Sequence, residues 1–385
     1  MGAWFVPLGT VLDSNGLHAL KPYAFASSAI AAFISPLIFG AMADRHIAPV
    51  RVLRWLALAT SAAMLMTAVA IGRGASPWLI LAFLQLHSLC SAPTWGISTS
   101  IVLGRLSDSR RQFGPIRALG SLGWMVGCWL VSALHADAST TACYTAALVW
   151  LLVVVLTYWL PSPAPPKSSE RLTIPQRLGW DALVLLKSHD HRVVFLTTAL
   201  FAIPLAAFYP YAPTHLRALG LERTAAWMTL GQVTEIIAML ALATLISRLR
   251  LKWTVALGLT FGVIRFALCA MDSHIPVLAG VTLHGFSFTL VYITAQIYLD
   301  HRVDPSWRVR AQALFSVMTS GVGNLAGYLG TGWWFNFSSA AGQVNWTLFW
   351  GGLSTLVALI LLFFLATYRG KKAPFRQPTP ELASH

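Results

Sequence analysis

Charged residues are scarce in this sequence: Asp, Glu, Lys and Arg make up 10% of its 385 residues, whereas hydrophobic residues make up 56%. A soluble domain carries about 25% charged residues, so this composition indicates a mostly helical integral membrane protein.

Cysteine is scarce as well. The four cysteines lie in apolar runs without metal-ligand spacing, so we expect buried thiols rather than a disulfide framework. They are Cys90, Cys128, Cys143 and Cys269.

Several functional motifs are missing. The sequence has no G-x-x-x-x-G-K-[ST] loop, which argues against ATP-driven transport within this chain. It has no H-E-x-x-H, no G-x-S-x-G and no paired carboxylates in an apolar span, so no enzyme is predicted. His189-Asp190-His191 lies in a basic loop without further ligands, and we predict no metal site and no cofactor. The net charge of +14 lies between apolar runs rather than on one face, so no nucleic-acid partner is expected.

Apolar runs of about 20 residues, long enough to cross a bilayer, repeat along the chain. We predict eleven spans, at 23–43, 51–72, 78–101, 115–135, 140–160, 192–211, 225–247, 253–271, 275–299, 311–335 and 345–368. Ahead of them, Gly2 to Leu12 is apolar but only about half long enough to span. We interpret it as a truncated first helix of a twelve-helix protein, for which a late start codon is one explanation.

Basic residues alternate from one connection to the next. Of the 27 Lys and Arg, 21 lie in every second connection and the tail, four lie in the other connections, and two lie inside spans. Because basic connections stay in the cytoplasm, both termini and the central loop are predicted to be cytoplasmic. We expect a bacterial inner-membrane protein and a monomer.

One linker divides the chain. The proline-rich segment from Pro161 is followed by a stretch to Lys187 that is typical of an amphipathic helix on the membrane surface. We therefore predict a six-helix half at 1–160, a cytoplasmic linker at 161–191, a second half at 192–368 and a disordered tail at 369–385.

Glu235 is the strongest single indication of function. It lies near the middle of the span at 225–247, about 18–20 Å from the nearest charge at either end. A carboxylate at that depth costs several kcal/mol unless it is protonated, paired or facing water, so we expect a proton or substrate site. A structural carboxylate paired across helices is the alternative. Gln232 lies on the same helical face.

Other polar residues also fall inside spans. Ser121 and Trp124 share a helical face with Arg117, whereas Arg117 alone would be consistent with snorkelling to the interface. His284 and Phe288 lie one turn apart, where packing is the alternative to binding. Arg265 lies seven residues from Asp272, and we expect it to snorkel outward.

Four motifs resemble those of one transporter family. Gly40-Ala-Met-Ala-Asp44-Arg45 resembles the G-x-x-x-D-R/K loop of the major facilitator superfamily. Phe113-Gly-Pro-Ile-Arg117-Ala-Leu-Gly-Ser121-Leu-Gly-Trp124 resembles I-R-x-W-G-T-x-G-F. Gln232-Val-Thr-Glu235 with Ile264-Arg265-Phe266-Ala-Leu resembles the pair Q-x-x-E and L-R-F-A-L. Arg308-Val-Arg-Ala-Gln312 resembles R-x-x-x-Q. Together they resemble the nucleoside:proton symporters of this superfamily.

The resemblance implies an all-α major facilitator fold of twelve helices in two six-helix halves, with a substrate site between them at mid-membrane. It also implies roles for particular residues. The implied substrate-binding residues are Arg117, Ser121, Trp124, Gln232, Glu235, His284 and Phe288. Proton coupling falls to Glu235 and His284, and conformational roles fall to Asp44, Arg45, Arg308 and Gln312.

Three departures from the family pattern affect the expected substrate. His284 replaces a tyrosine, Thr289 replaces a membrane carboxylate, and Ala206 and Tyr209 replace amides that bond the base. We predict proton-coupled uptake of a nucleoside-like small polar solute by alternating access. A permease for a small organic or aromatic acid, with Arg117 as the anion partner, and a non-transporting sensor or scaffold of the same fold remain as alternatives.

Overall fold

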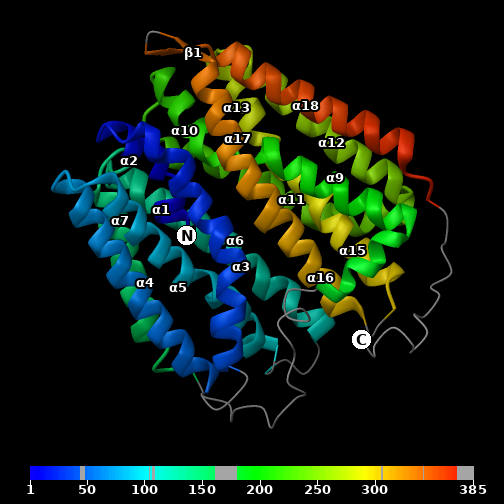
Figure 1. Ribbon diagram of the computed structural model, residues 1–385, viewed down its shortest axis with the longest axis horizontal. Helices are drawn as coiled ribbons and strands as arrows, with labels where there is room; N and C mark the ends of the chain where they lie inside the picture. Colours follow the sequence, from blue (N-terminus) through cyan, green and yellow to red (C-terminus); the bar gives the residue numbers. More distant parts are fainter. Residues whose placement is uncertain are drawn as a thin grey trace.

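The computed structural model describes residues 1–43, 48–103, 105, 109–160, 180–304, 307–340 and 342–370, and these are mostly helical (Figure 1). Asp44 and Arg45 lie outside the described residues. The helices of the first part of the chain lie together on one side of the molecule in Figure 1. They are α1 (Gly2–Phe5), α2 (Leu8–Ser14), η1 (His18–Leu20), α3 (Lys21–Ala43), α4 (Pro49–Gly72), α5 (Pro77–Leu103), α6 (Ser109–Ala133) and α7 (Thr141–Leu156).

The second part of the chain forms the other side. Its helices are η2 (Trp180–Lys187), α9 (His189–Leu205), α10 (Phe208–Ala218), α11 (Thr224–Arg248), α12 (Leu251–Cys269), α13 (His274–Thr282), α14 (His284–Phe288), η3 (Thr289–Ile293), α15 (Thr294–Arg302), α16 (Arg308–Ser316), η5 (Val317–Gly323), α17 (Asn324–Phe337) and α18 (Trp346–Thr367). The antiparallel strands β1 (Ser339–Ala340) and β2 (Gln343–Val344) form a short hairpin between α17 and α18, with Ser339 opposite Val344.

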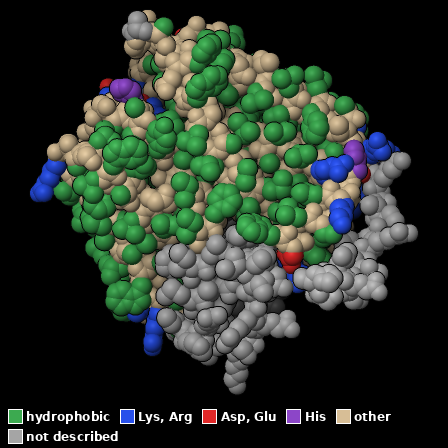
Figure 2. Space-filling model, in the orientation of Figure 1, with side chains coloured by type: hydrophobic (Ala, Val, Ile, Leu, Met, Phe, Trp, Pro, Cys, Tyr) green, Lys and Arg blue, Asp and Glu red, His purple; other side chains and the backbone are tan. Residues whose placement is uncertain are grey.

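Each predicted span coincides with one of these helices or with a run of them. Six helical segments are long and apolar enough to cross a membrane among the described residues: Pro49–Gly72, His189–Ala218, Thr224–Leu242, Leu251–Cys269, His274–Arg302 and Trp346–Thr367. Hydrophobic side chains cover the middle of the visible surface in Figure 2, with Lys and Arg near its margins. This distribution suits a protein surrounded by lipid.

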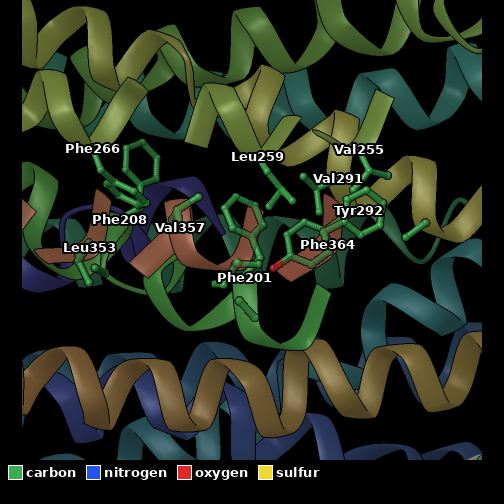
Figure 3. Packing of buried hydrophobic residues seen from close by; sticks show 14 of the residues in the cluster. Phe201, Phe208, Val255, Leu259, Phe266, Val291, Tyr292, Leu353, Val357 and Phe364 are labelled. Atoms are coloured by element: carbon green, nitrogen blue, oxygen red, sulfur yellow. The ribbon is translucent and has the colours of Figure 1, made fainter. Parts of the chain in front are cut away.

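The buried apolar residues form separate clusters on the two sides. The larger cluster draws mainly on α9 to α18, and Figure 3 shows part of it, where Phe201 and Tyr292 meet Leu259 and Val357. The second cluster draws mainly on α1 to α7. The four cysteines are buried free thiols, as predicted.

The linker differs from its prediction in the part that the structure describes. Trp180–Lys187 is a 3₁₀-helix rather than an α-helix, and it packs against α9 and α16. Ala182 and Leu185 are buried there, while Asp181 Oδ2 lies 3.0 Å from Arg310 Nη1. The apolar residues of this segment are therefore buried against neighbouring helices of the protein. Residues 161–179 lie outside the described part.

Candidate functional site

A cavity of about 650 Å³ lies between the two sides of the molecule. Its wall draws on α1, α3, α5 and α6 from the first part and, from the second, on α9, α10, α11, α14, η3, α15, α16, η5 and α17. Six of the seven predicted binding residues line it, namely Ser121, Trp124, Gln232, Glu235, His284 and Phe288. Arg117 belongs to α6, but its side chain lies outside the described part of the structure.

Helix α11 presents Gln232 and Glu235 to the cavity, one turn apart as their spacing predicts. Gln232 Nε2 donates a hydrogen bond to the Tyr209 hydroxyl at 3.2 Å. Helix α14 lies very close to this segment, since a Cβ added to Gly285 would collide with the backbone nitrogen of Glu235. The absent side chain at Gly285 therefore allows α14 to pack directly on α11.

Aromatic rings form two walls. On the first wall, the Tyr209 ring lies 5.7 Å from Trp124 and 5.3 Å from Phe5, measured between centroids. On the second, Phe288 lies 6.0 Å from His284 and 5.2 Å from Tyr292. Flat apolar surfaces of this kind suit a planar ring in the solute. Of these residues, Trp124, His284 and Phe288 were predicted for the site.

Arg265 corrects a sequence prediction. It was expected to snorkel outward, but its side chain is fully buried in α12 and turned into the protein. Its Nη1 lies 2.7 Å from His284 Nδ1 and 3.4 Å from Ser287 Oγ, and its guanidinium carbon lies 4.3 Å from the centre of the Phe208 ring. Aromatic faces and an imidazole therefore accept the cation, which removes the need to reach the interface.

Sequence reasoning missed the polar residues of α16, η5 and α17. Ser316, Thr319, Ser320 and Asn324 line the cavity opposite α11, together with Tyr328. The segment η5 is π-helical, and such wide turns often occur at functional sites. The small polar residues around Gly321 and Gly323 were the available signal. Thr289, in the π-helical segment η3, is fully buried beside Phe288.

Polar contacts join the two sides of the molecule at one end of the cavity. Lys21 Nζ lies 2.6 Å from Asp13 Oδ2 and 3.0 Å from Thr214 Oγ1, and Thr214 Oγ1 donates to the same carboxylate oxygen at 2.8 Å. Lys21 is almost fully buried in this cluster of α2, α3 and α10, whereas the side chain of Asp13 is 26% exposed. We call Asp13, Lys21 and Thr214 the polar clamp.

A second contact lies at the start of α11. Asp137 Oδ1 accepts hydrogen bonds from the backbone nitrogen of Ala225 at 2.7 Å and from Ser132 Oγ at 2.8 Å. A carboxylate in this position satisfies a free N–H of the helix terminus and suits its dipole. The loop between α6 and α7 is thereby tied to α11 of the other side.

The two remaining residues with predicted conformational roles, Arg308 and Gln312, tie α16 to α15. Arg308 Nε lies 3.8 Å from Asp300 Oδ1, and Gln312 Nε2 donates to the backbone oxygen of Gln296 at 2.9 Å. Both contacts stay within the second part of the chain. They brace the neighbourhood of Gln296, which lines the cavity.

Known proteins are similar to this chain in sequence. YegT of Escherichia coli (strain K12), named provisionally as a nucleoside transporter, is 32% identical over 96% of this chain and 90% of its own length. The xanthosine permease of the same organism is 25% identical over 94% of this chain and 91% of its own length.

Solved structures agree in fold. The crystal structure of a mutant of the nucleoside transporter NupG superposes with a TM-score of 0.88 at 22% identity and covers 96% of both chains. A D-xylose–proton symporter superposes with a TM-score of 0.69 at 14% identity and covers 97% of both chains. At these identities the likeness establishes the fold alone.

The family model described as "Nucleoside H+ symporter" matches residues 1–373. The chain therefore belongs to the nucleoside:proton symporter family of the major facilitator superfamily.

Proposed function

We propose that this protein carries a nucleoside-like solute together with protons across the bacterial inner membrane, and that the cavity described above holds the solute. The observation that supports this most directly is the joint presence of Gln232, Glu235, Trp124 and Phe288 on its wall. Amide and carboxylate groups suit the hydroxyls of a ribose, and aromatic rings suit a base. No chemistry is performed on the solute, so the protein acts as a transporter rather than an enzyme.

The proposed binding mode follows from these groups. Glu235 accepts hydrogen bonds from ribose hydroxyls with Gln232 beside it, and bonds to a charged group of this kind contribute about 1.5–3 kcal/mol each. Trp124 and Phe288 stack on the base from the two walls. Ser121 of α6 completes the site on the side of the first helices.

Proton coupling is assigned to Glu235. The surroundings of a carboxylate in a cavity differ when solute and water enter or leave, and its protonated and charged forms can therefore favour different conformations of the protein. His284 was a second candidate for this role, but its Nδ1 accepts a hydrogen bond from a guanidinium. Proton uptake at Nδ1 would place two cations in contact, which argues against His284 as the coupling group.

Alternating access needs a closed end and an open end. The polar clamp and the Asp137 cap join the two sides at the end formed by α2, α10 and the start of α11. We propose that this end faces the periplasm, that both termini are cytoplasmic, and that twelve helices in two halves (1–160 and 192–368) rock about the cavity. The basic connections support this orientation.

A panel of ligands tests the proposal and separates it from an organic-acid permease. Detergent-purified protein is heated with adenosine, uridine, ribose, benzoate or succinate, using both wild type and Glu235→Gln. A ligand at one hundred times its dissociation constant stabilises by about 2.7 kcal/mol, which raises the melting temperature measurably. We expect a shift with a nucleoside that shrinks in Glu235→Gln. A shift with carboxylates alone would replace the proposal by the acid permease.

A further inference from the structure

His284 is held from several directions although only part of it meets the cavity. Its ring stacks on Phe208 at a centroid distance of 4.1 Å, and it is 3% exposed. A Cβ added to Gly231 of α11 would lie 3.0 Å from its Cβ and 3.4 Å from its Cδ2. The imidazole is therefore packed between Phe208 of α10 and the backbone of α11 at Gly231.

The hydrogen bond from Arg265 fixes the position of the imidazole proton. A guanidinium carries only donors, so the 2.7 Å contact from Arg265 Nη1 requires Nδ1 of His284 to be an acceptor. An imidazole that accepts at Nδ1 is neutral and carries its proton on Nε2. The ring nitrogen of His284 that Arg265 leaves for another partner is consequently an N–H donor, and His284 is one of the residues that line the cavity.

Arg265 performs this role without meeting the solute. It is fully buried, it is absent from the cavity wall, and Phe208 and Phe266 cover its guanidinium at 4.3 Å and 4.7 Å from their ring centres. The cation is therefore held in place by rings on α10 and α12 rather than by the cargo.

We propose that Arg265 is a positioning residue that locks His284 as a constant Nε2–H donor, and that this donor selects solutes with a hydrogen-bond acceptor at that point. The inference rests on the proposed function and deepens it, because it states one requirement on the cargo. Nucleosides meet the requirement through a ring nitrogen or a carbonyl oxygen of the base. A solute that offers a donor or a C–H there leaves the buried N–H unpaired and is rejected.

The tautomer can be read without any ligand. Imidazole ¹⁵N chemical shifts distinguish a protonated from an unprotonated nitrogen, and the His284 signals are assigned by their loss in His284→Gln. We expect Nδ1 unprotonated and Nε2 protonated throughout pH 6–8. Among the described residues, the titratable or charged groups whose side chains contact His284 are Tyr209 and Arg265, and the backbone of Glu235 packs against the neighbouring Gly285. A spectrum with the proton on Nδ1, or an imidazolium in this range, would overturn the proposal.

Selectivity is measured with probes that differ in one acceptor. Equilibrium binding is compared for adenosine with its 1-, 3- and 7-deaza analogues, and for uridine with its 4-deoxy analogue. In wild type we expect at least one analogue to bind about tenfold more weakly than its parent. Arg265→Met should reduce that ratio below about threefold, because the unlocked imidazole can present either a donor or an acceptor.

A double variant shows whether Arg265 acts through His284. Alanine at residue 284 removes the imidazole, so adding Arg265→Met to His284→Ala should change the binding ratio by less than about twofold if Arg265 acts only through His284. Ser287→Ala is the matched control, because it removes the other acceptor of Arg265 Nη1 and leaves Nδ1 untouched.

Three results contradict the proposal: a ratio that persists in Arg265→Met, an effect of Arg265→Met that is as large in the His284→Ala background as in wild type, or wild-type binding that ignores every missing acceptor. If wild type binds none of these probes, the proposed nucleoside function fails instead, and the nitrogen shifts still report on the lock.

Discussion

The flat ring of Trp124 is proposed to provide a stacking surface for the base. It lines the cavity from α6, and its ring lies near Phe5 and Tyr209. Its position one turn from Ser121 places both side chains on the same wall. A base that stacks on this ring would lose a large flat contact if the ring were removed.

Trp124→Ala should therefore weaken nucleoside binding. Stacking between a base and an aromatic side chain contributes about 1–3 kcal/mol, so we expect roughly a 5- to 150-fold rise in the dissociation constant. Calorimetric titration with adenosine and uridine measures this change. Trp333→Ala is the matched control, because Trp333 of α17 is 67% exposed and should not affect affinity. Equal effects of both substitutions would show that Trp124 does not touch the solute.

Residue spacing predicted part of the candidate site and missed the rest for a physical reason. Gln232 and Glu235 are polar residues in the middle of an apolar span, so they can be recognised as candidate functional residues without knowledge of the fold. Arg265 can be recognised in the same way as a charged residue within a span. The direction of its side chain, however, depends on Phe208 and His284, which belong to other helices. Spacing within one helix does not reveal such partners.

At the scale of elements, close packing of α14 on α11 determines where Glu235 lies. Gly285→Ala would place a methyl group against the Glu235 backbone, so the two helices must separate. Overpacking of this kind costs about 1–3 kcal/mol and should lower the melting temperature. Thermal unfolding in detergent measures it.

Gly330→Ala in α17 is the control for that substitution. A Cβ at Gly330 meets nothing within 4 Å, and alanine favours helix by about 1 kcal/mol. We expect no loss of stability there. A destabilisation as large as that of Gly285→Ala would mean that helix geometry in general, rather than the α11–α14 contact, is responsible.

The polar clamp provides a prediction about conformation. Asp13→Asn leaves the buried Lys21 without its carboxylate, and an uncompensated buried cation is strongly unfavourable. The closed end should open several-fold more often. Spin labels at residues 15 and 220, measured as a distance distribution, would show a larger fraction of long distances.

Asp272→Asn is the matched control for the clamp. Asp272 Oδ1 lies 2.8 Å from His215 Nε2, so this contact also involves α10 but stays within the second part of the chain. We expect the distance distribution between residues 15 and 220 to remain that of wild type. If Asp13→Asn leaves the distribution unchanged as well, the clamp does not hold this end closed.

At the scale of the whole molecule, the order of apolar runs and basic connections predicted most of the fold. Each predicted span is helical, because a bilayer admits few other ways to satisfy the backbone. The breaks within the spans were not predictable in this way. The π-helical segments η3 and η5 both contribute residues to the cavity wall, and no residue in Thr289–Ile293 is a helix breaker.

Orientation is a prediction that concerns the molecule as a whole. Single cysteines at residues 15 and 384 can be labelled in intact cells with a membrane-impermeant maleimide. Since the four native thiols are buried, they provide a low background. We expect residue 15 to react from outside and residue 384 to react only after permeabilisation. The reverse pattern would contradict the cytoplasmic placement of the termini.

The central claim, that Glu235 couples a nucleoside to protons in this cavity, is tested most directly by uptake into proteoliposomes. Wild type and Glu235→Gln are compared for adenosine and uridine uptake driven by an inward proton gradient, and for exchange of the same nucleoside without a gradient. We predict that the gradient accelerates wild-type uptake but not uptake by the variant, which retains exchange. Gradient-driven accumulation by Glu235→Gln equal to that of wild type would contradict the account.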